Sequence, residues 1–130
     1  MSRPDPFDVA RDVASKSDPM VTRYRHGAVI MNSHGRIISH GTNHYKGNII
    51  ETIEGPIRKT IHAEIHALSK INVKTLDKST IISYGSTNVA AILARPCDNC
   101  WVVLSRLGFT KVFYSVRSSL TKPLWKEEWF

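Results

Sequence analysis

The stretch RPCDNCW, residues 95–101, contains both cysteines of the chain, Cys97 and Cys100. Two thiols three residues apart on a predicted helix share one helix face. A disulfide is the first interpretation, but Cys-x-x-Cys pairs that oxidise usually follow a strand in a thioredoxin-like pattern. Metal ligation is the second interpretation, and two cysteines alone do not complete a zinc site. The choice therefore depends on a third ligand elsewhere in the chain.

A second stretch, HAEIHAL at residues 62–68, supplies that ligand. The imidazole of His62 and the thiolates of Cys97 and Cys100 make a set of three protein ligands. Structural zinc sites close with four protein ligands, whereas catalytic sites keep one position for water. The chain has no further cysteine to close the site, so an open position is the simpler expectation. The N-terminus of the helix that carries the cysteines would favour their thiolate forms.

Glu64 stands two positions after His62, which in a regular helix puts the two side chains on roughly opposite sides. Both reach one site only if His62 lies at the very start of the helix, where the backbone is not yet fully wound. We predict that position for His62. Without ligands nearby, Glu64 would be an ordinary solvent-exposed helix residue. Beside them it is a candidate for moving protons in a reaction.

The remaining pattern alternates helices and strands. Helices are predicted at residues 5–16, 60–70 and 97–108, a β-hairpin within residues 26–43, and strands at residues 79–85 and 111–115. Residues 43–58 are predicted to be a long loop, residues 86–95 a short hairpin arm or an irregular excursion, and residues 118–130 a short helix or an edge strand. This order predicts an α/β sandwich with a partly parallel sheet. Residues 1–130 are expected to form a single domain.

The chain is basic, with 18 Lys and Arg against 11 Asp and Glu, for a net charge of +7. Residues 19–50 and 99–126 contain no acidic side chain. Basic surface attracts anions such as nucleotides and nucleic acid, although a solubilising face is the alternative. No apolar run approaches the length of a membrane span, and the first residues are too polar for a secretory signal. With two closely spaced cysteines, this predicts a reducing, intracellular and cytoplasmic location without a membrane partner.

The two motifs together match a known signature. HAE at residues 62–64 and PCDNC at residues 96–100 fit the His-x-Glu … Pro-Cys-x-x-Cys pattern of zinc deaminases. The chain resembles the cytidine and deoxycytidylate deaminase superfamily over roughly residues 5–115. Residues 26–43 resemble the family's first hairpin, which ends in Gly-x-Asn. Residues 96–115 resemble the deoxycytidylate-type branch, with Trp101 in place of the Arg-Gln common in free-cytidine deaminases.

The resemblance implies a cytidine deaminase-like fold, a three-layer α/β/α sandwich with a mixed sheet of about five strands and two helices that carry the zinc site. It implies one Zn²⁺ per chain, held by His62, Cys97 and Cys100, with water or hydroxide as the fourth ligand. Glu64 would transfer protons while that hydroxide attacks C4 of cytosine, and uracil would be the product. The longer excursion at residues 85–94 resembles compact deaminase-like proteins of large viruses and phages, which would act in a host cell.

Two substrate contacts are expected from the same resemblance. Asn43, at the end of the Gly-x-Asn, would hydrogen-bond the sugar, although an ordinary turn asparagine is the alternative. The backbone N–H of Ala63 would bind the base carbonyl. His66 lies four residues after His62, but the zinc-protease motif needs a Glu directly after the first His, so packing or an outer hydrogen bond is predicted for His66. The remaining histidines are predicted to be strand, turn and loop residues: His26, His34, His40 and His44.

Three functions follow from these observations. The leading prediction is deamination of a free pyrimidine nucleotide, dCMP to dUMP, because basic residues flank the hairpin that ends in Asn43. The second is a cytosine deaminase acting on single-stranded DNA or RNA, which the basic charge and the aromatic residues favour, and adenosine deamination on transfer RNA shares the motif. The third is a non-catalytic, zinc-containing nucleic-acid-binding module, against which Glu64 argues. Because family members are commonly oligomers, a homo-oligomer is expected.

Overall fold

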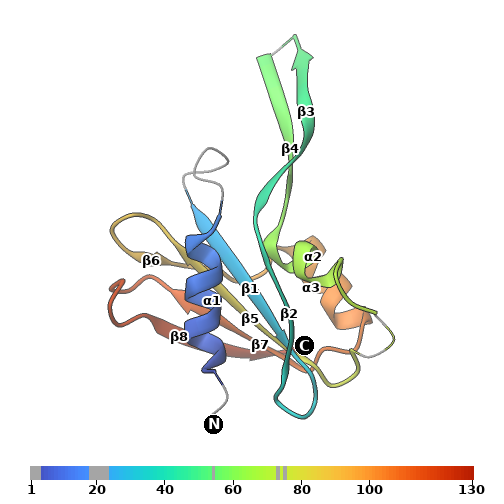
Figure 1. The fold of residues 1–130 in the computed structure, drawn as a ribbon, viewed down its shortest axis with the longest axis vertical. Coiled ribbons are helices and arrows are strands. Elements are labelled where there is room, and N and C mark those ends of the chain that lie inside the picture. Colours follow the sequence, from blue (N-terminus) through green and yellow to red (C-terminus); the bar gives the residue numbers. More distant parts are fainter. Residues whose placement is uncertain (1–3, 18–23, 54, 73, 75) are drawn as a thin grey trace.

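The computed structural model describes residues 4–17, 24–53, 55–72, 74 and 76–130. Within these residues, a six-stranded mixed sheet has the strand order β2-β1-β5-β7-β8, and β6 pairs with β5 beside this path. Helix α1 covers one face of the sheet, whereas α2 and α3 lie on the other (Figure 1). The predicted three-layer α/β/α sandwich with a mixed sheet is confirmed.

Helix α1, Pro6–Ser15, is capped by Asp5, whose carboxylate accepts a 2.9 Å hydrogen bond from a backbone N–H of the first turn. Proline at the first helical position fits this start, because its missing N–H would have no partner there. Gly27 lets the helix approach the sheet closely, since a Cβ at this position would lie 2.5 Å from Ala10 O and from Ala14 N. The predicted N-terminal helix is confirmed.

Strands β1, Arg25–Met31, and β2, Ile37–Thr42, form the predicted antiparallel hairpin. Asn32 organises the turn, because its side-chain oxygen accepts two 3.0 Å hydrogen bonds from backbone N–H groups of the turn. Gly35 has a φ of 76°, which glycine adopts without strain. The turn chemistry of the sequence therefore produces the expected connection.

The long loop predicted at residues 43–58 is wrong. Strands β3, His44–Thr52, and β4, Gly55–Ile61, pair antiparallel as a two-stranded arm, residues 44–61, that projects away from the main sheet (Figure 1). The glycines and the proline that suggested a loop have positions compatible with strands. Gly47 falls in an irregularity of the register, and the Gly-Pro pair begins β4 beside the turn.

Strand β5, Thr80–Ser86, lies in the middle of the sheet and is buried along its whole length. It pairs in parallel with β7, Lys111–Val116, and helix α3, Asp98–Arg106, lies in the connection between them. Gly108 follows the C-cap residue of α3 and has a φ of 93°, the left-handed conformation with which helices often end. A buried parallel pair joined through a helix places the ends of β5 and the start of α3 close together.

The two ambiguous segments both become strands. β6, Ala91–Ile92, pairs with the end of β5 as a short hairpin arm. β8, Leu124–Trp129, pairs antiparallel with β7 at the edge of the sheet, so the helical alternative for the tail is wrong. Trp125 explains the outcome, because it packs on the Phe7 ring at 4.7 Å between centroids and so attaches the strand to α1.

Helix α2, Ala63–Leu68, is shorter than the predicted 60–70, because Thr60 and Ile61 belong to β4 and His62 is the N-cap residue. It turns Ala63, Glu64 and Ala67 toward the protein interior, whereas Ile65 is exposed. Gly41 of β2 allows α2 to lie directly on the sheet, since a Cβ there would be 2.4 Å from Ala67 N.

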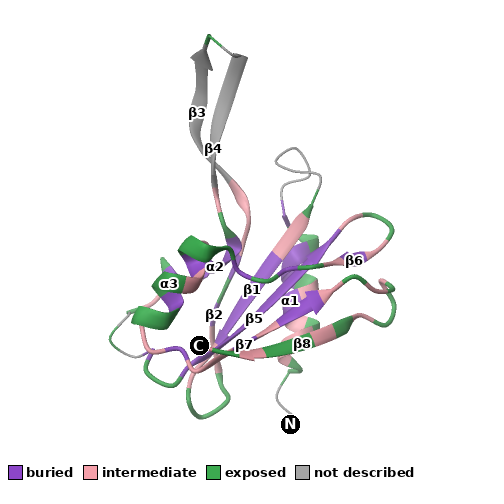
Figure 2. Ribbon diagram, turned by 180° about the vertical axis from the view of Figure 1, so that it is seen from behind, coloured by how far each residue is buried: buried purple, intermediate pink, exposed green. Residues whose placement is uncertain are grey.

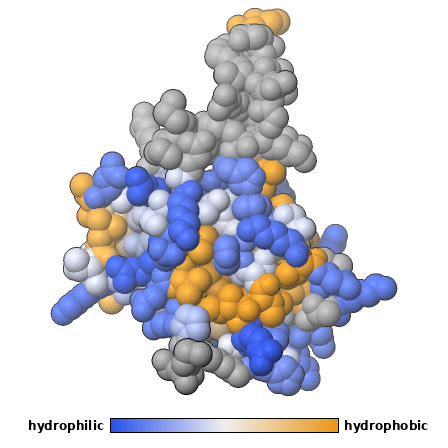
Figure 3. Space-filling view, in the orientation of Figure 1, coloured by the Kyte–Doolittle hydropathy of each residue, from blue (hydrophilic) through white to orange (hydrophobic). Residues whose placement is uncertain are grey.

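Buried side chains concentrate on the central strands β1, β5 and β7 (Figure 2). One hydrophobic cluster lies between the sheet and the α2–α3 layer, and a second lies between the sheet and α1. On the α1 side the surface is mostly hydrophilic, with an apolar band where the second cluster reaches the surface (Figure 3). The core thus fixes both helices that the sequence associates with a metal.

Candidate metal centre

His62 is the N-cap residue of α2, with φ −70° and ψ 150°. The prediction that His62 lies at the very start of its helix is therefore confirmed. Because the extended backbone at His62 precedes the first helical turn, its imidazole and the side chain of Glu64 are not forced to opposite sides of a regular helix. Strand β4 leads into His62 without an intervening loop.

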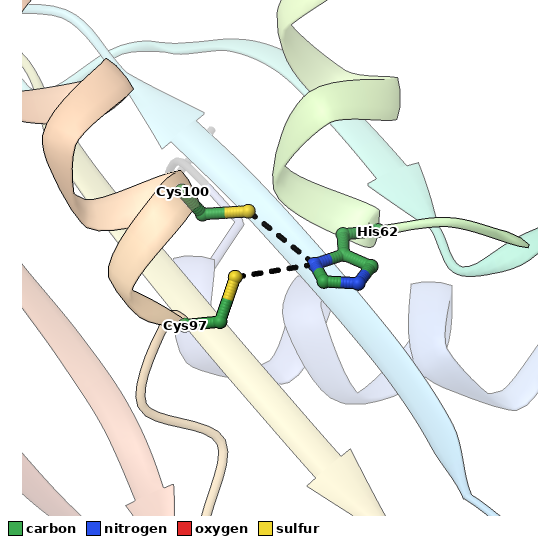
Figure 4. A group of neighbouring side chains, drawn as sticks. All are labelled: His62, Cys97 and Cys100. Atoms are coloured by element: carbon green, nitrogen blue, oxygen red, sulfur yellow. Dashed lines mark hydrogen bonds between the residues drawn. The ribbon is translucent and has the colours of Figure 1, made fainter.

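Cys97 is likewise the N-cap residue of α3, with φ −65° and ψ 166°, and Cys100 lies in the first turn. The Sγ atoms of Cys97 and Cys100 are 3.5 Å and 3.4 Å from Nδ1 of His62. Figure 4 shows both thiols pointing at this one nitrogen. Two helix starts, one on each side of a short gap, thus bring three ligand atoms within 4.8 Å of one another.

The arrangement fits zinc. Two ligands of one tetrahedral zinc ion, with Zn–S near 2.3 Å and Zn–N near 2.0–2.1 Å, are about 3.6 Å apart. The observed separations of 3.4 and 3.5 Å agree with that value. A neutral imidazole nitrogen offers one lone pair, so it cannot accept full hydrogen bonds from two thiols at once. A shared cation satisfies all three atoms together.

The charge balance of the site also calls for a cation. Burial raises the pKa of the Cys100 thiol well above its ordinary value, and the nearby Glu64 and Cys97 raise it further. Cys100 is buried, whereas Cys97 and His62 are exposed. A metal cation compensates for the negative charge that the thiolates and the carboxylate would otherwise place in one small region.

Glu64 lies inside the molecule, with a side chain only 1% exposed. Its Oε1 is 3.4 Å from Nε2 of His26, and no atom of the described chain forms a hydrogen bond with this oxygen. Buried carboxyl oxygens normally have hydrogen-bond partners, since leaving one unpaired costs about 1–3 kcal/mol. The unpaired oxygen is therefore a feature that packing alone does not explain.

A cavity of about 570 Å³ opens beside these groups. It is lined by Glu64, His62 and Cys97 on one side and by residues of β1, β5, β6 and the β2–β3 junction on the others. Its remaining lining residues are Tyr24, Arg25, His26, Asn43, Ile61, Gly85, Ile92, Leu93, Ala94 and Arg95. The cavity has room for a nucleoside-sized molecule, and two arginines lie at its wall.

Asn43 lines the cavity, and its amide also organises the chain around it. Its Oδ1 accepts hydrogen bonds from Ser17 Oγ at 2.9 Å and from His26 N at 3.0 Å, and its Nδ2 donates to Tyr24 O at 3.2 Å. Ala63 is fully buried at the first position of α2, next to His62. Asn43 and Ala63 therefore both lie near the candidate ligands.

The other histidines have separate roles. Nδ1 of His66 accepts a 3.0 Å hydrogen bond from the backbone N–H of Thr42, in agreement with the packing role predicted for it. His26, predicted to be an ordinary strand residue, instead lies in the cavity wall beside Glu64. The period-2 pattern of β1 could have indicated this position, because Gly27 faces α1 and its neighbour His26 must then face the α2 side.

Trp101 packs on the Phe130 ring, with 4.4 Å between centroids, and the Arg95 guanidinium lies 4.2 Å from the centroid of the Trp101 ring. Trp101 therefore helps to hold α3 in place and is not among the cavity residues of the described chain. No helix within the described ranges is both long and apolar enough to cross a membrane.

Comparison with known proteins gives one family and one fold. Residues 5–116 match the family described as "Cytidine and deoxycytidylate deaminase zinc-binding region". The fold is similar to the crystal structure of a cytidine deaminase from Burkholderia pseudomallei, with a TM-score of 0.62 and 16% sequence identity over 95% of this chain and 89% of that chain. None of the curated proteins matches the chain.

Proposed function

The chain belongs to the cytidine and deoxycytidylate deaminase family, and on this premise we propose that it hydrolyses the exocyclic amine of cytosine in a free nucleotide, converting dCMP to dUMP. The observation that carries the proposal is the buried Glu64 carboxyl group, with its unpaired Oε1 in a cavity wall beside His62 and Cys97. A purely structural metal site would not need such a carboxyl group.

Glu64 is the proposed proton carrier. When bound by His62, Cys97 and Cys100, zinc supplies a Lewis acid that makes a water molecule reactive toward C4 of cytosine. Glu64 Oε1 accepts the proton that this water releases and passes it to N3 of the base. As the C4–N bond breaks, Glu64 takes the second proton from the new C4 hydroxyl group, which becomes the carbonyl, and gives it to the amine, which leaves as ammonia.

Two groups are proposed to orient the substrate. The N–H of Ala63 belongs to the first turn of α2, where backbone N–H groups have no partner within the helix, so it suits the carbonyl oxygen of the base. Asn43 lies in the same cavity wall with its amide held by Ser17 and His26. A fixed amide at this position suits a hydrogen bond to the sugar.

Arg25 is the proposed phosphate contact. It lines the cavity together with Arg95, but Arg95 already forms two hydrogen bonds with Glu128, of 3.1 and 3.3 Å. The charge of Arg95 is therefore largely compensated, which leaves Arg25 to attract an anionic substrate.

Ammonia release from zinc-loaded protein with cytidine, deoxycytidine, CMP and dCMP tests this function. We expect dCMP to give the highest kcat/KM. Arg25→Gln should raise KM for dCMP about 10-fold or more and leave KM for deoxycytidine nearly unchanged, because a charge-assisted contact to phosphate is lost. Arg36→Gln, in the exposed β1–β2 turn, is the matched control. Equal activity on nucleosides and monophosphates would contradict the substrate assignment.

A second candidate is a deaminase of single-stranded nucleic acid. Tyr24, at the cavity wall, is 52% exposed and could stack with a base next to the target. Uracil formation in a short single strand, with binding that weakens steeply as salt rises, would favour this candidate. Zinc-loaded protein without activity on any cytosine or adenine substrate would instead favour a non-catalytic binding module.

We further propose a homo-oligomer in a reducing, cytoplasmic location. Both cysteines are free thiols, as a metal site in a reducing compartment requires. Helix α3 presents Val102 and Val103 to solvent, which supports a contact with another copy. The molar mass from light scattering measures the oligomeric state, and a mass of one chain at all concentrations would contradict the expectation.

A further inference from the structure

His26 lies between two polar side chains in the wall of the cavity. Its Nε2 is 3.4 Å from Glu64 Oε1 and forms a short hydrogen bond with Ser83 Oγ. Ser83 is fully buried in the central strand β5, so its hydroxyl is a fixed point in the sheet. The imidazole of His26 therefore lies between the rigid core and the carboxyl group that the proposed reaction uses.

The sheet register explains how the ring reaches Ser83. His26 on β1 is directly opposite Gly85 on β5, and Ala28 is opposite Ser83. His26 and Ser83 are thus diagonal neighbours on one face of the sheet. Because Gly85 has no side chain, the imidazole can lie across the position opposite it and reach the serine.

The backbone of His26 is held as firmly as its ring. The His26 N–H donates to Asn43 Oδ1 at 3.0 Å, and Ser17 Oγ lies 3.2 Å from both the N and the O of His26. The ring itself is about one-fifth exposed, with 22% of its surface accessible. Few conformations of His26 are compatible with these contacts, which is the condition for one side chain to orient another.

We propose that His26 is a positioning residue for Glu64, whose imidazole, 3.4 Å from Oε1, limits the positions that this carboxyl oxygen can take in the cavity wall. The proposal rests on the proposed deaminase function. A glutamate that receives and delivers protons at two substrate atoms must stay within hydrogen-bond reach of both, and a displacement of about 1 Å can cost about 100-fold in rate. Oε1 has no hydrogen bond among the described residues, so the packing of the imidazole against it at 3.4 Å is the contact that limits its position.

Kinetics of His26→Leu and His26→Gln test the proposal. In His26→Leu, with zinc content unchanged, kcat should fall about 10- to 100-fold while KM changes less than about threefold, because substrate binding persists and Glu64 is misplaced. His26→Gln should recover a large part of kcat, since its side-chain amide reaches the position of Nε2. Ser83→Ala should lower kcat in the same direction by releasing the ring. His40→Leu, on the exposed part of β2, is the matched control without an expected effect.

A readout independent of activity completes the test. Crystal structures of the zinc-loaded parent and of His26→Leu should show different rotamers of Glu64. An unchanged Glu64 rotamer, an unchanged kcat in His26→Leu, a loss confined to KM, or an equal loss in the Leu and Gln variants would overturn the proposal. If the parent deaminates no substrate, the proposed function fails, and the Glu64 rotamers still decide whether His26 positions that side chain.

Discussion

His62 and Cys97 occupy N-cap positions at which other residue types would stabilise the helices more. Ser, Thr, Asp and Asn usually fill this position because their side chains accept a hydrogen bond from the first turn, and losing that bond costs about 1 kcal/mol. Within the described chain, neither His62 nor Cys97 makes a side-chain capping bond. Both side chains are instead directed at each other. The two helix starts are therefore less stable than they would be with capping residues, but the candidate ligand atoms lie close together.

Glu64→Gln separates the chemistry from the metal site. We expect kcat to fall about 10³-fold or more with zinc content retained, because the amide cannot carry protons and His62, Cys97 and Cys100 are untouched. The metal-free variant should be more stable than the metal-free parent by about 1–2 kcal/mol, since a neutral amide costs less to bury than a carboxylate. Metal analysis, steady-state rates and denaturant unfolding measure the three effects.

Glu127→Gln, an exposed carboxylate on β8, is the control for both effects and should change neither. Undiminished deamination by Glu64→Gln would remove Glu64 from the mechanism.

At the scale of elements, two glycines set the distances between the layers. A Cβ at Gly27 would meet the backbone of α1, and a Cβ at Gly41 would meet the backbone of α2. Gly27 is opposite Thr42 in the β1–β2 register, so the neighbouring Gly41 faces the other side of the sheet. Each helix thus depends on one position without a side chain.

Gly41→Ala should therefore act on the metal site from a distance. The new methyl group would lie 2.4 Å from Ala67 N and 2.6 Å from Ala63 O, so α2 must shift and carry His62 with it. We expect a loss of about 1–3 kcal/mol in the free energy of unfolding, together with weaker zinc binding. Gly27→Ala makes a similar clash with α1 and should lower stability without weakening zinc binding. Equal zinc affinities in the two variants would contradict this division.

The start of α2 and the β1–β2 turn could be predicted from the sequence, because residues close together in the chain determine both. The start of α2 at His62 follows from the need to bring His62 and Glu64 together, and the β1–β2 turn follows from Asn32 and Gly35. The 44–61 arm was missed because its glycines and proline are typical of loops, whereas long-range pairing made them part of strands. The role of His26 depends on Ser83, 57 residues away, which a local pattern does not contain.

At the scale of the whole molecule, the last strand is connected to the candidate metal centre. Glu128 on β8 binds Arg95 through both carboxylate oxygens and also accepts a hydrogen bond from Tyr114 OH. Arg95 precedes Cys97 by two residues and lies over the Trp101 ring. The C-terminal strand thus supports the segment from which α3 and its cysteines begin.

The pH dependence of stability should reveal this connection. Hydrogen bonds from Arg95 and Tyr114 lower the pKa of Glu128 below its ordinary value. A lowered carboxyl pKa adds stability above the ordinary value, about 4.3, and this stability is lost as the pH falls toward the pKa of the folded state. Glu128→Gln should therefore lower Tm near pH 7 and have a progressively smaller effect below about pH 4.

Because the Glu128 side chain still contacts solvent, the effect of Glu128→Gln on Tm should also shrink at high salt. Thermal unfolding of the parent, Glu128→Gln and Glu127→Gln across this pH range measures it. A Tm difference between the parent and Glu128→Gln that is the same at every pH would show that lost packing, not charge, is responsible.

The 44–61 arm is joined directly to a residue of the candidate metal centre. It projects away from the sheet, and its second strand continues directly into His62 (Figure 1). His62 therefore joins the arm to α2 and also carries the imidazole. A change in the direction of β4 at its inner end would therefore displace the imidazole of a candidate metal ligand.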